Sequence, residues 1–106
     1  MLQAVFVFRT MDNNVKAYQE YLVKEKNFSA LTVTAYLNDI LSFETYLVNY
    51  HDAIGLGDIT YGVIRSWIVF LVENKNANKT INRKISSLKS FYKFLLKIKE
   101  IDANPL

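Results

Sequence analysis

The sequence predicts an all-α fold, a compact bundle of four helices, and three observations support this prediction. Only 3 glycines and 1 proline interrupt the 106 residues. Long stretches repeat apolar residues at intervals of three and four, the spacing of one helix face, and no strand pattern competes with them. A chain of this length that is 51% hydrophobic can enclose one core but not two. We therefore expect an N-terminal extension at residues 1–11, one helical domain at 12–100 and a terminal segment at 101–106.

The first two predicted helices each begin at a residue that can cap them. Asp12 is a good N-cap for a first helix that ends near Asn27, and Ser29 can cap a second, longer helix that runs to about Tyr50. The first helix has Val15, Tyr18 and Leu22 on one face. In the second helix, the apolar residues at core spacing are Val33, Tyr36, Leu37, Ile40, Phe43 and Leu47.

A long loop and two further helices complete the predicted fold. Gly55, Gly57 and Asp58 are poor helix formers and place the loop at residues 51–59. A third helix follows from Thr60 and ends in the polar run 73–78, and a fourth spans about 79–97. Their expected core positions are Ile64, Trp67, Ile68 and Leu71, then Ile81, Ile85, Leu88, Tyr92 and Leu95. Because a proline forces the residue before it to be extended, Pro105 predicts that the chain leaves the last helix and departs.

Positive charge is concentrated towards the end of the chain. Between Lys75 and Lys99 there are eight basic residues and no Asp or Glu. Since the whole chain has a formal net charge of +3, the residues outside this segment sum to −5. The charge asymmetry therefore lies mainly in the predicted fourth helix.

If the core positions of the fourth helix are buried, its opposite face is rich in basic, hydroxyl and amide side chains. Phosphate recognition uses this mixture, because fixed positive charge displaces counterions and short donors set the register on individual oxygens. The free N–H groups at the start of the helix, beside Lys79 and Thr80, also favour an anion. The residues expected on this face are Asn82, Arg83, Ser86, Lys89, Ser90, Lys93 and Lys97.

Simpler interpretations remain open for the lysine-rich face of the fourth helix and for the threonines of the second helix. A lysine-rich helix face is most often a solvated surface, although such surfaces usually mix both signs of charge. Thr32 and Thr34 lie off the core face of the second helix and could donate to a nucleic-acid backbone, but threonines near a helix start also serve as local caps. Asp39 and Glu44 would repel DNA if they were directed at it, so any contact from this helix must favour its first two turns.

Several classes of function lack support in the sequence. No apolar run approaches the roughly 18 to 20 residues that cross a bilayer, so we expect a soluble protein with no membrane partner. The absence of cysteine excludes disulfides and thiolate metal sites, and agrees with a reducing cytoplasm. There is no glycine-rich phosphate loop, metal-ligand spacing or catalytic triad, and His51 stands alone in a loop, so we expect no cofactor, metal or catalytic residue. The apolar opening, Met1 to Phe8, lacks the marks of a secretory signal and is expected to form an extra strand or a frayed arm.

Two separated stretches carry a resemblance to a known family. Lys79 to Leu95, KTINRKISSLKSFYKFL, has a polar start, Arg-Lys, a small pair, a basic residue, Phe-Tyr and Phe-Leu, and Asn104-Pro105 follows. Ser29 to Ile40, SALTVTAYLNDI, has a serine, a threonine, a tyrosine and an aspartate at characteristic intervals. These stretches resemble the last and the second helix of the core-binding domain of tyrosine recombinases of the phage-integrase and Xer type. The resemblance covers about residues 13–106.

The resemblance implies a four-helix, SAM-like domain that forms one half of a C-shaped clamp around a recombination half-site. It implies double-stranded DNA as a partner, and other recombinase subunits when they assemble on DNA, with the isolated domain a monomer. The family's tyrosine nucleophile and its arginine- and histidine-rich cluster lie after the Asn-Pro linker, so the resemblance implies a non-catalytic domain whose catalytic partner lies beyond this sequence. It also implies that residues 101–106 are the start of that linker.

The DNA-facing residues implied by the resemblance come from the second and fourth helices. Ser87 lies near the boundary of the buried stripe, and Lys84 is expected to lie partly towards the core. We expect Arg83→Ala and Lys89→Ala each to weaken DNA binding and to leave the fold intact. Together with Lys93 from the exposed face, the candidates are Thr32, Thr34, Lys79, Thr80, Asn82, Arg83, Ser86, Ser87 and Lys89.

The alternative function is that of a helical protein-protein interaction module with a solvated basic face. Its candidate contacts are Tyr46, Phe94 and the arm from Met1 to Phe8. Added salt separates the two functions, because it weakens phosphate-driven binding steeply and does not weaken apolar association.

Overall fold

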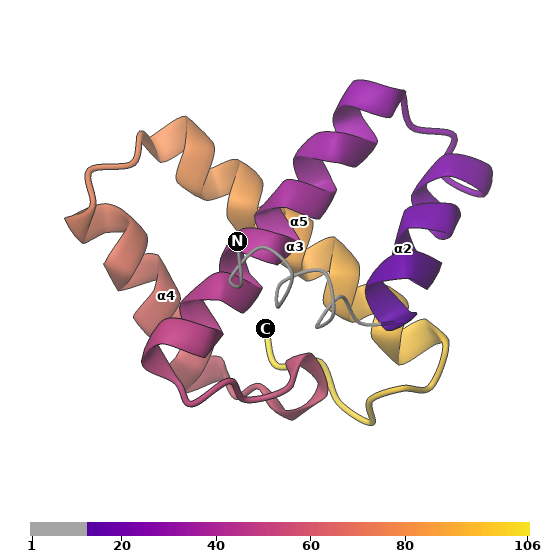
Figure 1. Cartoon of the computed structure of the whole chain (residues 1–106). Helices are drawn as coiled ribbons and strands as arrows, with labels where there is room; N and C mark the ends of the chain where they lie inside the picture. Colours follow the sequence, from indigo (N-terminus) through magenta and orange to yellow (C-terminus); the bar gives the residue numbers. More distant parts are fainter. Residues whose placement is uncertain (1–12) are drawn as a thin grey trace, which may run out of the picture.

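The computed structural model of the chain describes residues 13–106. Four α-helices and one 3-10 turn make up the described part, which contains no strand (Figure 1). The elements are α2 (Asn13–Lys24), α3 (Ala30–Tyr50), η1 (Leu56–Asp58), α4 (Tyr61–Glu73) and α5 (Asn78–Lys97). The all-α prediction is confirmed, with helix bounds close to those expected. The proposed cap Asp12 and the apolar opening at residues 1–8 lie outside the described residues.

Local capping explains where α3 and α4 begin. The Ser29 hydroxyl accepts a hydrogen bond from the Thr32 N–H at 3.2 Å, as its position before the second helix predicts. The Thr60 hydroxyl accepts one from the Val63 N–H at 3.4 Å. Ala77, which precedes α5, has no side chain that can cap, so α5 begins without this help.

The core lies between all four helices, and α3 and α5 cross near its centre (Figure 1). Trp67 of α4 packs against Phe43 of α3 with ring centroids 4.8 Å apart, and Tyr18 of α2 meets Phe91 of α5 edge-on at 5.2 Å. Most of the predicted core positions are buried, as expected. Four are only partly buried, although they pack against the core: Tyr36, Leu37, Ile68 and Ile85.

The alternative function predicts that Tyr46 and Phe94 contact a protein partner, and this prediction is wrong. Both are buried, with 6% of each residue exposed. The Tyr46 ring packs against Phe70 at 4.9 Å, and its hydroxyl lies 3.1 Å from Nε2 of His51. His51 is therefore not a solitary loop residue, since it contacts this aromatic cluster at the end of α3. Phe94 packs between rings of α2, with its centroid 4.9 Å from that of Tyr21.

The segment after α5 also differs from its prediction. Ile101 and Leu106 are partly buried against the core, so the chain turns back towards the middle of the molecule instead of departing (Figure 1). The Leu106 N–H donates to Oδ1 of Asn104 at 3.0 Å, which closes a turn around Pro105. The extended geometry before a proline directs the chain only locally, whereas burial of two apolar side chains decides where it goes.

Candidate functional site

The exposed surface of α5 carries most of the predicted site. Its core stripe, which includes Ile81, Leu88 and Leu95, turns the opposite side of the helix to solvent. We call this surface the basic face and define it as Lys79, Asn82, Arg83, Ser86, Lys89 and Lys93, all of which are exposed. Thr80 is half-buried beside it.

Free positive charge on the basic face is concentrated at three lysines. Among the ion pairs of residues 13–106, none involves Lys79, Lys89 or Lys93. Lys97, one turn beyond Lys93, lies 3.6 Å from Glu25 and 5.0 Å above the ring of Tyr21, so its charge is tied to α2. The unneutralised part of the surface therefore ends at about Lys93.

The two predicted threonines at the start of α3 differ in accessibility. Thr34 is exposed, but Thr32 is half-buried and its hydroxyl lies 3.0 Å from Oγ of the capping Ser29. The Thr32 hydroxyl therefore contacts the capping serine, and the Thr32 backbone N–H is the group that Ser29 caps. Thr34 is the more accessible donor on this helix.

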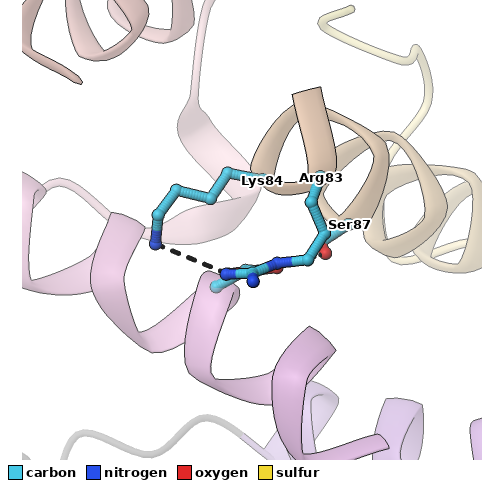
Figure 2. A network of polar contacts seen from close by, with 4 residues as sticks. Arg83, Lys84 and Ser87 are labelled. Carbon is cyan, nitrogen blue, oxygen red and sulfur yellow. Dashed lines mark hydrogen bonds and ion pairs between the residues drawn. The ribbon is translucent and has the colours of Figure 1, made fainter. Parts of the chain in front are cut away.

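A buried carboxylate joins α3 to α5 directly beneath the basic face. Figure 2 shows Arg83, Lys84 and Ser87 of α5 directed towards α3. Two guanidinium nitrogens of Arg83 donate to the two oxygens of Asp39, Nη2 to Oδ1 at 2.8 Å and Nε to Oδ2 at 3.1 Å. The Ser87 hydroxyl donates to Oδ2 at 2.6 Å, and the Lys84 ammonium lies 3.4 Å from Oδ1. We call these four residues the Asp39 network.

The network keeps Asp39 ionised although its side chain is only 1% exposed. Burial by itself would raise the pKa of this carboxyl, but hydrogen bonds from Arg83 and Ser87 and the charge of Lys84 hold its pKa below the ordinary value. The same contacts raise the pKa of Arg83. A buried charge that is hydrogen-bonded on every side is the arrangement in which such a group is tolerated inside a protein.

The network bears on three expectations. Ser87 is buried and uses its hydroxyl on Asp39, so it does not lie on the exposed surface. Asp39 does not present a repelling charge, because it is enclosed and paired with two cations. Arg83 serves the fold as well as the surface, so Arg83→Ala is no longer expected to leave the fold intact. Lys84 does lie towards the core, with 13% of its side chain exposed.

Sequence reasoning missed the structural role of Asp39, although a signal was present. Asp39 stands four residues before Phe43 and three after Tyr36, which places it within the buried stripe of α3. A carboxylate in such a stripe requires a partner. The identity of that partner depends on how α3 and α5 cross, which helical spacing does not reveal.

Other kinds of site find no support in the part of the chain that the structure describes. No group of three or more His, Asp or Glu residues is arranged to hold a metal ion in residues 13–106. Within the same range, no helix combines the length and the apolar character needed to cross a membrane.

Comparison with known proteins identifies the fold family. The family model for the phage integrase N-terminal SAM-like domain matches residues 15–99. The chain is 40% identical over 93 residues to tyrosine recombinase XerC of Bacillus subtilis (strain 168). The aligned stretch covers 88% of this chain and 30% of that protein. The chain is 35% identical over 92 residues to tyrosine recombinase XerD of Rickettsia bellii (strain RML369-C), covering 87% of this chain and 30% of that protein.

These matches extend over almost the whole described chain but over only part of the relatives. The chain spans about 30% of the length of the curated relatives it matches. No solved structure matches it. Since the family model matches residues 15–99, most of the chain, the chain belongs to the family of phage integrase N-terminal SAM-like domains.

Proposed function

We propose that this chain binds double-stranded DNA through the basic face of α5, as the DNA-binding N-terminal domain of a site-specific tyrosine recombinase. One observation carries the proposal. Lys79, Lys89 and Lys93 lie along one exposed face that contains no acidic residue, and none of them is in an ion pair in residues 13–106. Three unneutralised cations beside exposed Asn82 and Ser86 match what phosphate recognition requires.

The location of the acidic residues supports the same function. A carboxylate close to the basic face would oppose a polyanion, and Asp39 is the acid bonded to this surface. It is enclosed, and two cations surround it, so the surface above it stays positive. A merely solubilising surface does not require this arrangement, because solvated faces usually alternate both signs of charge.

Within a complete recombinase, we propose that the domain clasps one recombination half-site for DNA integration or recombination. The relatives are named as tyrosine recombinases, and this chain corresponds to about 30% of their length. Cleavage and strand exchange would then belong to the remaining part of such a protein. Contact with other recombinase subunits on DNA stays a prediction.

The proposal is tested by NMR titration of the isotope-labelled chain with a short duplex of arbitrary sequence, first at low and then at moderate salt. We expect weak binding, with a dissociation constant on the order of 10⁻⁴ to 10⁻⁶ M for non-specific contact. Amide shifts should move from Lys79 to Lys93 and near Thr34, and added salt should reverse them. Absence of shifts on α5 at low salt would favour the solvated-surface interpretation and reject the proposal.

Lys89→Ala supplies the sharpest single variant, because Lys89 is exposed and lies outside the Asp39 network. We expect weaker DNA binding and a salt dependence that is smaller by about 0.9 in the slope of log K against log salt, the loss for one phosphate contact. Lys24→Ala is the matched control, since Lys24 lies on α2 beside Glu20. Equal effects of the two substitutions would show that only net charge matters.

A further inference from the structure

We propose that Asp39 is a positioning residue for DNA binding: it holds the guanidinium of Arg83 in the orientation that meets a phosphate. The inference rests on the proposed function and names a role that a buried acid would not be expected to have. Asp39 itself, at 1% exposure, does not reach the DNA.

The contact between the two side chains leaves part of the guanidinium available. An arginine has five N–H donors in a planar fork. Asp39 is contacted through Nε and Nη2 only, which leaves both donors on Nη1 and one on Nη2. Arg83 also keeps 47% of its side chain exposed, so the unused edge of the fork reaches solvent. One carboxylate can therefore fix the plane of the guanidinium while its other edge receives a phosphate oxygen.

Asp39 is fixed firmly enough to act as an anchor. Its Oδ2 accepts the Ser87 hydroxyl at 2.6 Å, and the Lys84 ammonium lies 3.4 Å from Oδ1. Both of these residues belong to α5, the helix that carries Arg83. The carboxylate is therefore held in register with the basic face, and Arg83 is oriented before any ligand arrives. Preorganisation of this kind reduces the loss of side-chain freedom on binding.

Charge alone predicts the opposite effect of Asp39. Removing a negative charge close to a DNA-binding surface should strengthen the attraction of a polyanion. Removing an anchor should weaken binding, because Arg83 then samples many rotamers and loses its planar alignment. The sign of the change in affinity therefore distinguishes positioning from simple electrostatics.

The experiment measures binding of the whole chain to a fluorescent duplex by anisotropy at low salt. Asp39→Asn keeps the size of the side chain but places an amide NH₂ against one of the Arg83 donors, which breaks the two-point contact. We expect affinity to fall about threefold to tenfold, roughly the effect of one lost hydrogen bond. In an Arg83→Ala background, the same substitution should no longer weaken binding. Because both substitutions disturb the same pair, circular dichroism at the binding temperature must show that each variant is folded before the affinities are compared.

Two further variants separate orientation from folding. Tyr92→Phe removes the 2.6 Å hydrogen bond from the Tyr92 hydroxyl to the Leu56 carbonyl, which involves no residue of the basic face, and should leave affinity unchanged although it also weakens the core. Arg83→Lys keeps the positive charge but not the planar fork, so it should bind DNA more weakly than the original chain. This second variant also tests the proposal if Asp39→Asn does not fold.

The outcomes separate this inference from the function on which it rests. Binding that is unchanged or tighter in Asp39→Asn, or unchanged in Arg83→Lys, would overturn the positioning role. So would equal weakening by Asp39→Asn with and without Arg83. If Lys89→Ala still weakens binding in those cases, the basic face survives and only the role of Asp39 fails. If the original chain shows no salt-dependent binding, the proposed function fails instead.

Discussion

Neighbouring residues of the same type have different roles because their surroundings differ. Ser86 and Ser87 are adjacent in sequence, yet Ser86 is exposed on the basic face and Ser87 is buried against Asp39. Arg83 and Lys89 are both exposed cations, but Arg83 is held by a carboxylate and Lys89 has no ion pair in the described range. Substitution of Ser87 should therefore act on stability and substitution of Ser86 or Lys89 on binding, whereas substitution of Arg83 should affect both.

Asp39 makes the free energy of unfolding depend on pH. Because the pKa of Asp39 in the folded chain lies below its ordinary value of about 3.8, the carboxylate stabilises the fold fully above that value. We expect the free energy of unfolding to decrease as the pH falls below about 4, since protonation removes the charge that Arg83 and Lys84 face. Urea unfolding followed by circular dichroism between pH 7 and pH 2.5 measures this dependence.

Asp39→Asn is the variant that isolates this contribution. At neutral pH it should be less stable than the original chain by about 1.5 to 3 kcal/mol, the contribution of hydrogen bonds to a charged group. The difference between the two proteins should shrink as the pH falls. Asp102→Asn, at an exposed position outside the network, is the control and should change neither quantity. A constant difference across the pH range would contradict the assignment.

At the scale of the helix, the caps explain why some helices begin where the sequence predicts. Ser29 and Thr60 accept hydrogen bonds from backbone N–H groups at the starts of α3 and α4. The helix with the basic face is the exception, because Ala77 precedes it in an extended conformation with no side-chain acceptor. The start of α5 therefore depends on tertiary packing more than the starts of α3 and α4 do.

Ala77→Ser should stabilise the chain. The backbone of Ala77 already has the extended geometry of an N-cap, with φ −65° and ψ 147°, so a serine hydroxyl there could accept from the first turn. We expect a gain of about 0.5 to 1 kcal/mol in the free energy of unfolding, measured by chemical denaturation. Ala17→Ser makes the same change inside α2 at an exposed position, where serine is the poorer helix former, and should cost a few tenths of a kcal/mol. Stabilisation by both substitutions, or by neither, would contradict the capping explanation.

At the scale of the whole molecule, one core supports both the fold and the site. α5 contributes Leu88, Phe91 and Leu95 to this core and presents the basic face on its other side. Since α3 crosses α5 at the centre, the position of the basic face relative to Thr34 depends on how these two helices pack (Figure 1). Loss of core packing should therefore lower stability and binding together.

Leu88→Ala tests this dependence. Leu88 is 1% exposed, and its truncation should cost about 2 to 5 kcal/mol, the range for a buried leucine that leaves a cavity. Leu31→Ala is the matched control, because Leu31 on α3 is 85% exposed, and it should change stability by less than about 0.5 kcal/mol. Thermal unfolding of the two variants gives the comparison. Similar losses in both would show that the core does not lie where the structure places it.

The sequence by itself determined the four helices, most of their buried stripes and the surface that is basic. These features follow from local properties: the three- and four-residue spacing of residues such as Leu88 and Leu95, the capping side chain of Ser29, and the run of basic residues without an acid. Helix geometry converts each of them into structure without reference to distant parts of the chain.

Only the tertiary structure decided which polar residues of those helices serve the fold and which face solvent. Asp39 is a buried anchor and Ser87 its donor because α3 crosses α5 where their side chains meet, 48 positions apart in the sequence. Tyr46 and Phe94 are buried, and Ile101 and Leu106 return to the core, for the same reason. Hydrogen-bond partners and apolar burial depend on contacts between distant segments, whereas periodicity describes one helix at a time.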